Sequence, residues 1–417
     1  MKVLLSAYAC EPNRGSEPAI GWNNAKAIAQ YHTVWVFTSQ CYQAAIEAEL
    51  TRNPIPNLHF VYLDPFGWVY DWSQEGKRPH WDAHLHYYLW QIWAYFVARS
   101  LHQTIGFDLV HHVSYVKYCH PSFLALLPIP LIWGPVGGGE SAPEIFWSDF
   151  SFRGKSYEIA RSLVRWIGEH DPFVRLTARK SCFIWATTQD TANRLQDLAV
   201  GKEVQILAES GILETEISQL TESTSFNCSP ARFISMARLL HWKGLHIGIR
   251  AFAQAKLDDA EYWILGDGPE RERLQRLAEE LGVDHQIKFW SKLPRDQALD
   301  KLNQCLALVH PSLHDSGGWV CLEAMAAGCP VICLDLGGPA EQVTAETGFK
   351  IPAISPEQSV EGVAKAMQQL AYDPNLREKM GQAGQKRVKN QYTWEAKAQI
   401  IHQTYEQVLN KLSASGC

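Results

Sequence analysis

Short apolar runs alternate with stretches of helical spacing along nearly the whole chain. Apolar runs of this length favour buried strands, and their alternation with helices is typical of parallel βαβ sheets. The pattern therefore predicts an α/β fold with one series of strands in each half. The expected strands cover residues 3–8, 33–39, 58–64, 109–114, 130–135, 183–188 and 204–209, and then 233–239, 261–267, 286–291, 306–312, 330–336 and 348–352.

The two series are separated by a polar, Ser/Thr-rich run at residues 218–231, which is typical of a linker. We therefore expect an N-terminal Rossmann-like domain over residues 1–217 and a C-terminal one over 232–390. In open α/β sheets ligands bind at the carboxyl ends of the strands, so a cleft between the two is expected. Residues 391–417 have helical spacing and no following strand, so they form a helix that packs back on the first domain or completes the second.

Composition narrows the class of protein. A chain of 417 residues favours two domains, and 46% hydrophobic with 20% charged residues excludes wholesale disorder. A net charge of −6 argues against nucleic acid as the main partner. The ten cysteines form no CxxC pair. Reduced core cysteines in a cytoplasmic protein are therefore expected, and a disulfide framework or a zinc site is not.

Neither secretion nor a membrane span is expected. The first strand follows Met1 and Lys2 directly, and the longest apolar stretch, residues 122–133, is interrupted by two prolines. Several of the 16 tryptophans fall within residues 67–101, which end in a helix. The aromatic face of that helix is either ordinary core or a contact with lipid or sugar, so peripheral membrane contact stays open.

Residues 310–339 are the most informative segment. A strand that ends at His310 leads through a Gly-bearing turn into a helix expected over residues 319–327. Such a turn presents free backbone N–H groups and a helix N-terminus to an anion. Asp315 and Glu323 lie eight residues apart in this frame, which suits a ligand carrying phosphate and hydroxyls. Glu323 is flanked by apolar residues and is expected to point inward. A solvated helix position is the alternative.

Two cations follow the first strand of the second half. Arg238 and Lys243 stand where a strand ends, and together they form a natural clamp for a diphosphate. Surface charges in a loop are the alternative. Gly266 and Gly268 follow the next strand and permit a tight turn near a nucleotide. Arg271 occupies the third glycine position of the dinucleotide fingerprint, so an NAD enzyme is disfavoured.

Two Gly-bearing loops follow strands in the first half. Gly15 lies in the first strand-to-helix loop, where it would let backbone approach a ligand, and the alternative is a helix capped by Ser16. The second loop holds three glycines before an acid, more than a turn requires, which favours the lining of a cleft. These acceptor-side candidates are Gly137, Gly138, Gly139 and Glu140.

Adjacent histidines end another strand of the first half. His111 and His112 must face opposite sides of the sheet, so one of them can point at a cleft. An imidazole there could act on an acidic hydroxyl. A structural histidine is the alternative.

Four segments, taken together, are similar to one known family. They are residues 237–244 (ARLLHWKG), 266–270 (GDGPE), 310–332 and 336–343 (LGGPAEQV). In this order and spacing the chain resembles a family 4 retaining glycosyltransferase of the GT-B fold, and the resemblance covers nearly the whole chain. It implies two Rossmann-like domains that face a central cleft, with a nucleotide sugar on the second.

The resemblance implies a role for each matching residue. Glu323 would hold ribose hydroxyls, and Asp315 or the backbone from Ser316 to Trp319 would hold those of the sugar. Arg238 and Lys243 would grip the diphosphate and stabilise the leaving group. The donor-binding residues would be Arg238, Lys243, Gly266, Gly268, Ser316, Gly317, Gly318, Trp319, Glu323 and Gly15, and the catalytic ones Asp315, His112, Arg238 and Lys243.

Two departures from the family pattern are visible. The usual acidic pair is Glu, seven residues, Glu, whereas Asp315 stands first here. The shorter side chain leaves the donor sugar open. Family members often carry a D-x-x-H-x-H run in the first domain. Asp108 and His111 fit it, but Val113 occupies the second His place, and His112 is a candidate by neighbourhood.

The resemblance further implies transfer of a hexose from a nucleotide diphosphate sugar to an acceptor hydroxyl. Residues 15–22 and 134–140 resemble a bacterial subgroup of polysaccharide and glycolipid assembly, so the expected acceptor is a saccharide or a lipid-linked saccharide. The chain has no DxD run, and neither a cofactor nor a metal is expected. An epimerase of GT-B fold and a non-catalytic nucleotide-sugar-binding subunit are the alternatives.

Overall fold

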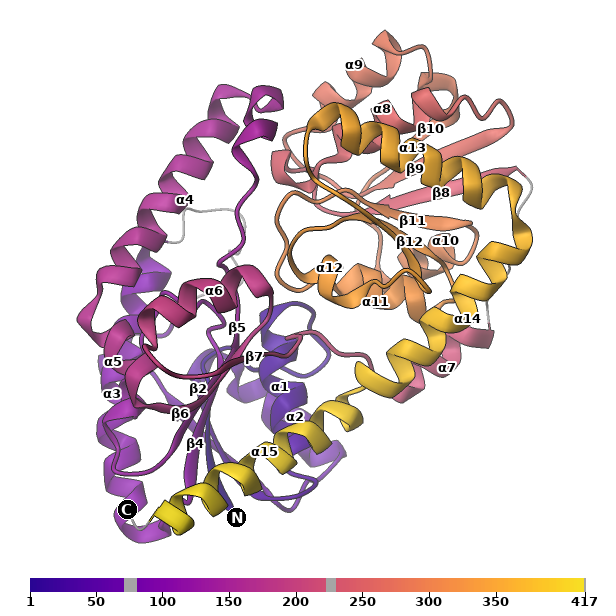
Figure 1. Cartoon of the computed structure of the whole chain (residues 1–417). Coiled ribbons are helices and arrows are strands. Elements are labelled where there is room, and N and C mark those ends of the chain that lie inside the picture. Colours follow the sequence, from indigo (N-terminus) through magenta and orange to yellow (C-terminus); the bar gives the residue numbers. More distant parts are fainter. Residues whose placement is uncertain (71–80, 223–229, 416–417) are drawn as a thin grey trace. The chain divides into compact units, whose positions relative to one another are not determined.

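The computed structural model describes residues 1–70, 81–222 and 230–415, which form two compact units (Figure 1). Unit 1 is drawn from Met1–Gly139, Leu163–Glu209 and Trp394–Cys417. Unit 2 is drawn from Glu140–Ser162 and Ser210–Thr393. Each unit contains one parallel sheet with helices on its faces, so the expected α/β fold with two Rossmann-like domains is confirmed.

Unit 1 holds a seven-stranded sheet of order β3-β2-β1-β4-β5-β6-β7. Its strands are β1 (Lys2–Ala7), β2 (Thr33–Ser39), β3 (Leu58–Leu63), β4 (Leu109–Ser114), β5 (Leu131–Val136), β6 (Ser181–Ala186) and β7 (Val204–Ile206). Its helices are α1 (Glu17–Ile28), α2 (Gln43–Arg52), α3 (Trp81–Ile105), α5 (Pro172–Lys180), α6 (Gln189–Leu198) and α15 (Trp394–Ser415). Each strand predicted for the first half is present.

Side chains of β1 and β4 alternate between two cores. Leu5 and Leu109 pack into the cluster that includes Trp22 of α1, whereas Leu4 and Val110 pack into the cluster that includes Trp90 of α3. Because successive residues of a strand face opposite sides, a strand covered on both faces is apolar throughout. Trp90 is therefore core, as one interpretation of the Trp-rich stretch proposed, although the same helix exposes other aromatic residues.

The C-terminal helix α15 packs against unit 1. Ile401, Tyr405 and Val408 belong to the same core cluster as Leu5 and Leu109. The Tyr405 hydroxyl lies 2.6 Å from His111 Nδ1, and both side chains are fully buried. Residues far apart in the sequence thereby close one face of the sheet.

Unit 2 holds a six-stranded sheet of order β10-β9-β8-β11-β12-β13. Its strands are β8 (Ala231–Met236), β9 (Ala260–Leu265), β10 (Ile287–Trp290), β11 (Ala307–His310), β12 (Val331–Leu334) and β13 (Gly348–Ile351). Its helices are α7 (Glu214–Glu222), α8 (Leu245–Ala255), α9 (Arg271–Glu280), α10 (Arg295–Leu302), α11 (Trp319–Ala326), α12 (Gly337–Gln342), α13 (Pro356–Tyr372) and α14 (Pro374–Gln391). Each strand predicted for the second half is present.

Local chemistry sets several helix starts. Ser355 and Asp373 accept backbone N–H bonds at the starts of α13 and α14, and Pro356 and Pro374 follow them. Proline at the first helical position loses no intrahelical bond, so a cap followed by proline begins a helix at a defined residue.

The division of the chain differs from the predicted boundaries at residues 140–162. These residues, predicted within the first domain, cluster with unit 2, because Asp149 pairs with Arg250 and Phe146 packs into the core of that unit. Helix α4 (Phe152–His170) starts in this segment and continues into unit 1. Half of the predicted linker falls on residues 223–229, which lie outside the described residues. Its first residues finish α7 and its last begins β8.

Replacing Tyr405 by Ala should destabilise unit 1. The change removes a fully buried ring and leaves His111 Nδ1 without its partner, and truncation of a buried aromatic ring costs about 3–5 kcal/mol. Urea unfolding followed by circular dichroism measures it. Ile400→Ala, at a more exposed position of the same helix, is the control and should shift the midpoint far less. Equal midpoints for the two variants would show that α15 does not stabilise this face.

Candidate functional site

The loops that follow β8, β9, β11 and β12 meet at the carboxyl edge of the unit 2 sheet, where backbone packs on backbone. Gly266 has φ +138°, and a Cβ there would lie 2.0 Å from the Ala237 carbonyl oxygen. A Cβ on Gly268 would lie 2.4 Å from the Leu239 oxygen. Both glycines thus seat the 266–268 turn against the loop that carries Arg238. A larger residue at either position would push that loop away.

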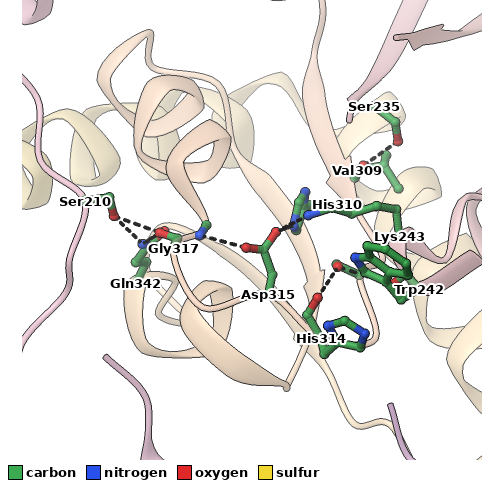
Figure 2. A network of polar contacts seen from close by, with 12 residues as sticks. Ser210, Ser235, Trp242, Lys243, Val309, His310, His314, Asp315, Gly317 and Gln342 are labelled. Atoms are coloured by element: carbon green, nitrogen blue, oxygen red, sulfur yellow. Dashed lines mark hydrogen bonds and ion pairs between the residues drawn. The ribbon is translucent and has the colours of Figure 1, made fainter. Parts of the chain in front are cut away.

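Asp315 and Lys243 form an ion pair at this edge, although 72 residues separate them. The Asp315 side chain is 18% exposed. Its Oδ2 also lies 3.2 Å from His310 Nε2, and its Oδ1 accepts from Gly318 N at 3.3 Å. Burial alone would raise the pKa of Asp315, but the Lys243 charge and the His310 contact hold it well below its usual range. Figure 2 shows Asp315 at the centre of these contacts.

The Asp315 loop is held from its other side by the start of α12. Gly338 N donates to the Asp315 carbonyl oxygen at 2.7 Å, and a Cβ on Gly337 would lie 2.4 Å from that oxygen. Next to it, Gln342 Nε2 donates to the Gly317 oxygen at 2.6 Å, and the Ser210 hydroxyl donates to the same oxygen at 2.7 Å (Figure 2). These hydrogen bonds to the backbone oxygens of the turn therefore hold it in place.

This turn leads into α11, whose N-terminus has no side-chain cap within the described residues. Gly318 occupies the cap position with φ 53°, in the left-handed region that favours glycine. The predicted donor residues Ser316, Gly317 and Trp319 surround this point. Uncapped N–H groups at a helix N-terminus can bind an anion, so the local geometry fits the sequence prediction.

Glu323 lies in α11 and is held by Arg295. Its Oε1 accepts from Arg295 Nε at 3.0 Å and from Nη2 at 2.8 Å, and Arg295 Nη1 also contacts Glu216 Oε1 at 2.5 Å. The Glu323 side chain is 13% exposed. Burial raises the pKa of Glu323, although Arg295 opposes the rise. The inward position expected for this carboxylate is thus observed, and Arg295 is a partner that the sequence did not identify.

Arg238 differs from the other charged residues of this edge. Its side chain is exposed and makes no polar contact within the part of the chain that the structure describes. Its backbone is nevertheless fixed, because Ala237 N donates to Leu265 O at 3.0 Å and Leu239 N donates to Asp267 O at 2.9 Å. The guanidinium is therefore an unengaged cation on a rigid loop.

A buried carboxylate supports the two loops that carry Lys243 and Asp315. Glu158 of α4 lies 3.0 Å from His241 Nε2 and 3.2 Å from His314 Nε2. Trp242 stacks between His314 and Tyr157 at centroid distances of 5.2 and 4.8 Å. Sequence analysis did not predict this cluster. The only indication was the His and Trp residues that stand next to Lys243 and Asp315 in the sequence.

Glu140, predicted as an acceptor-side residue, lies in unit 2. It is buried, and its Oε2 accepts from the Ser316 hydroxyl at 2.6 Å. Gly139, the residue before it, belongs to unit 1, where its N–H donates to Thr191 Oγ1 at 3.1 Å. The glycine loop therefore marks the point where the chain passes from one unit to the other.

The other predicted site glycines of unit 1 lie in different environments. Gly137 N donates to Val116 O at 2.6 Å, and Gly138 has φ +91°. Gly15 is exposed, and a Cβ there would meet no described atom within 4 Å, so packing does not require glycine. Ser16 makes no side-chain cap to α1, so the capping alternative is not realised.

His111 and His112 face opposite sides of the β4 strand, as predicted, and both are fully buried. His112 Nδ1 lies 3.1 Å from the Ser6 hydroxyl and Nε2 lies 3.4 Å from Tyr115 O. Burial lowers the pKa of His112 to about 4 and that of His111 to about 3. Both imidazoles are therefore neutral near pH 7, and a catalytic role for His112 stays a prediction.

Known proteins resemble this chain in sequence and in fold. Residues 217–387 match the family model described as glycosyl transferases group 1. Sucrose-phosphate synthase from Thermosynechococcus elongatus superposes with a TM-score of 0.64 at 16% identity, over 98% of this chain and 99% of that one. The chain has the GT-B fold. The structure of Anabaena HepE in complex with UDP gives a TM-score of 0.60 at 17% identity, over 97% of this chain and 99% of that one.

A curated relative agrees with this result. The lipopolysaccharide core biosynthesis glycosyltransferase LpsE of Rhizobium meliloti is 27% identical over 233 residues. That match covers 55% of this chain and 65% of LpsE, so the chain spans less than two thirds of the relative's length. The resemblance to glycosyltransferases of GT-B fold is thus confirmed, and membership of family 4 within them stays a prediction.

No helix in residues 1–70, 81–222 or 230–415 is both long enough and apolar enough to cross a membrane. In the same residues, no group of three or more His, Cys, Asp or Glu side chains could hold a metal ion. Six of the eight described cysteines are buried, and all eight are free.

Gly266→Ala should be strongly destabilising, whereas Gly15→Ala should be silent. The first change places a methyl group 2.0 Å from a carbonyl oxygen at a φ that L-residues rarely adopt, and the second meets no described atom within 4 Å. We expect Gly266→Ala to lower the free energy of unfolding by at least about 2 kcal/mol. Thermal melting of both variants tests this, and unchanged melting of Gly266→Ala would contradict the close backbone packing.

Glu158→Gln should change how stability depends on pH. Burial alone would raise the pKa of Glu158, but the hydrogen bonds from His241 and His314 hold it at about 2, below its ordinary value of 4.5. The folded pKa is depressed, so the stabilisation is fully present above pH 4.5 and is lost as pH falls toward 2.

The variant should therefore be less stable than the parent at pH 7. The difference in free energy of unfolding between the two should decrease as pH falls from 5 to 3. Urea midpoints across this range measure the difference. Glu280→Gln changes an exposed carboxylate of α9, so its stability should match that of the parent at every pH. A stability difference that stays constant with pH would show that the charge of Glu158 does not stabilise the fold.

Proposed function

We propose that this protein is a retaining glycosyltransferase that moves a hexose from a nucleotide diphosphate sugar to an acceptor hydroxyl. The observation that carries the proposal is the carboxyl edge of the unit 2 sheet. There an unengaged guanidinium, a lysine-aspartate pair and an uncapped helix N-terminus are held by close backbone packing. In open α/β sheets this edge is where ligands bind.

In the proposed complex the diphosphate lies between the cations and the start of α11. Arg238 offers a planar fork of donors, and backbone N–H groups near Gly318 offer a second anion contact. Glu323 would accept ribose hydroxyls through the carboxylate oxygen that Arg295 does not contact. The raised pKa of this carboxyl accords with a position shielded from water.

Lys243 is the residue whose partner would change. It now neutralises Asp315, and both side chains are largely buried. A diphosphate competes for Lys243 with two negative charges, so donor binding would draw the ammonium toward phosphate. Asp315 would keep its contacts with His310 and Gly318 N, and it would turn its freed oxygen to a sugar hydroxyl.

The simplest reaction needs no protein nucleophile. The bond between the sugar C1 and the diphosphate oxygen breaks while the acceptor oxygen attacks from the same face. The acceptor proton moves to a phosphate oxygen of the leaving diphosphate, so the configuration at C1 is retained. Arg238 and Lys243 stabilise the charge that develops on the diphosphate, which is electrostatic catalysis and is expected to be the largest contribution.

Known relatives indicate the class of partners. The HepE structure contains UDP, and the name of LpsE concerns lipopolysaccharide core biosynthesis. On this basis we propose a nucleotide-sugar donor and a saccharide or lipid-linked saccharide acceptor for this chain. No cofactor and no metal are part of the proposal, because two cations and a helix N-terminus can neutralise the diphosphate.

Arg238→Ala should weaken binding of the diphosphate and leave the fold intact. The guanidinium has no polar partner among the described residues, so its removal breaks no internal bond. Loss of a charged hydrogen bond of about 1.5–3 kcal/mol corresponds to an affinity lower by about 10- to 100-fold. Calorimetry with UDP, GDP and ADP, and hydrolysis of the matching sugar donors, measure it.

The matched control is Arg276→Ala. Arg276 is also an exposed arginine of unit 2, and among the described residues its side chain donates only to the Glu272 carbonyl oxygen. This variant should bind and turn over donor as the parent does. Parent-like affinity and turnover in Arg238→Ala, with folding verified by circular dichroism, would refute the proposed donor site.

A further inference from the structure

Arg295 joins two carboxylates that come from different helices. Its Nε and Nη2 donate to Glu323 Oε1 of α11 at 3.0 and 2.8 Å, and its Nη1 donates to Glu216 Oε1 of α7 at 2.5 Å. Arg295 is itself the first residue of α10, so three helices of unit 2 each contribute one charged side chain. The arginine offsets one of the two carboxylate charges, and one negative charge remains.

Both hydrogen bonds from Arg295 to Glu323 end on the same oxygen. A guanidinium often binds a carboxylate as a fork, with one donor on each oxygen. Here Nε and Nη2 share Oε1 of Glu323, and Nη1 is engaged by Glu216. The Glu323 carboxylate is therefore oriented through one oxygen, while Oε2 makes no contact with Arg295. An ionised carboxylate only accepts hydrogen bonds, so Oε2 suits a ligand that brings hydroxyl groups.

Glu216 is held by the start of its own helix. Its Oε2 accepts from Leu213 N at 3.1 Å, and Leu213 stands directly before α7. A glutamate in the first turn that bonds back to the residue before the helix is one half of a capping box. This bond leaves Oε1 of Glu216 to Arg295. The position of the guanidinium is thus set by the backbone at the start of α7.

The exposure of the two partners shows where the contact matters. The Arg295 side chain is 49% exposed and that of Glu323 is 13% exposed. An ion pair with a half-exposed partner contributes little to the stability of a fold. Its effect on Glu323 is larger, because burial raises the pKa of this carboxyl, Arg295 lowers it and the neighbouring Glu216 charge raises it. Among the described residues, Arg295 and Glu216 are the charged groups that act on Glu323.

We propose that Arg295, held by Glu216, is a positioning residue that directs Glu323 Oε2 to the ribose hydroxyls and makes the site selective for ribonucleotides over 2′-deoxyribonucleotides. The inference rests on the proposed function, because it takes Glu323 as the group that accepts these hydroxyls. A largely buried acceptor that loses its hydroxyl partner is costly to desolvate. A site built in this way therefore binds a nucleotide without the 2′-hydroxyl more weakly.

Calorimetry of the full chain with UDP, GDP and ADP, each beside its 2′-deoxy form, tests the proposal. The parent should bind the ribonucleotide for which it has the highest affinity at least about tenfold more tightly than the matching deoxy form. Arg295→Gln should lower this ratio to about threefold or less, because Glu323 loses the hydrogen bonds that orient it. The affinity of the variant for the deoxy form should change far less.

The pH dependence of binding of the same ribonucleotide separates positioning from a loss of structure. A protonated Glu323 is a poorer acceptor, so binding weakens as pH falls through the raised pKa of this carboxyl. Arg295→Gln removes the charge that lowers this pKa, so the loss of affinity should begin at a higher pH than in the parent. Glu216→Gln removes a charge that raises it, so the loss should begin at a lower pH. Titration of the nucleotide phosphate is common to all variants and cancels in the comparison.

Arg295→Lys separates the charge of the arginine from its shape. Lysine keeps the positive charge and loses the planar set of donors, so the variant should keep the pH profile of the parent and only part of its preference for ribose. Arg276→Gln is the matched control, because it changes an exposed arginine of α9 in the same unit. This variant should keep both the affinity ratio and the pH profile of the parent.

An undiminished ribose preference in Arg295→Gln, with folding verified by circular dichroism, would overturn the proposal. Shifts of the pH profile in the same direction in Arg295→Gln and Glu216→Gln would also overturn it. If Arg295→Gln does not fold, Arg295→Lys and Glu216→Gln carry the test.

The outcome is distinguishable from failure of the proposed function. Arg238→Ala acts on the diphosphate, so it should weaken the ribose and deoxyribose forms equally and leave their ratio as in the parent. Weaker binding in Arg238→Ala together with parent-like ratios in Arg295→Gln would keep the proposed donor site and refute only the positioning role. Absence of nucleotide binding by the parent would overturn both proposals.

Discussion

The ion pair between Lys243 and Asp315 is the interaction on which the site depends. Removing two charges from water is costly, and the cost is offset only when the remaining hydrogen-bonding capacity is satisfied. His310 and Gly318 N do this for the carboxylate. The pair can form only because glycines let the surrounding loops pack backbone to backbone, so loop geometry and electrostatics depend on one another.

Helix α4 supports the loops at the carboxyl edge of the unit 2 sheet. It provides Glu158, whose carboxylate contacts His241 and His314 beside Lys243 and Asp315.

Much of the fold could be predicted because it rests on short-range patterns. The β11 strand, the turn at residues 316–318 and α11 follow from an apolar run, two glycines and helical spacing. The position of Glu158 could not be predicted, because its partners are 83 and 156 residues away in the sequence. A glutamate between Tyr157 and Ile159 looks like an ordinary helix residue. Only the tertiary packing within unit 2 brings its carboxylate to His241 and His314.

The sequence by itself determined the succession and direction of the strands, the glycines of the turns at residues 266–268 and 317–318, and four charged residues near the carboxyl edge of the unit 2 sheet: Arg238, Lys243, Asp315 and Glu323. Those features depend on the local period of apolar residues and on backbone sterics. The tertiary structure alone decided that Lys243 meets Asp315, that Arg295 holds Glu323 and that Glu140 bonds Ser316 across 176 residues. Pairing of this kind depends on how loops are placed in space, which no local pattern encodes.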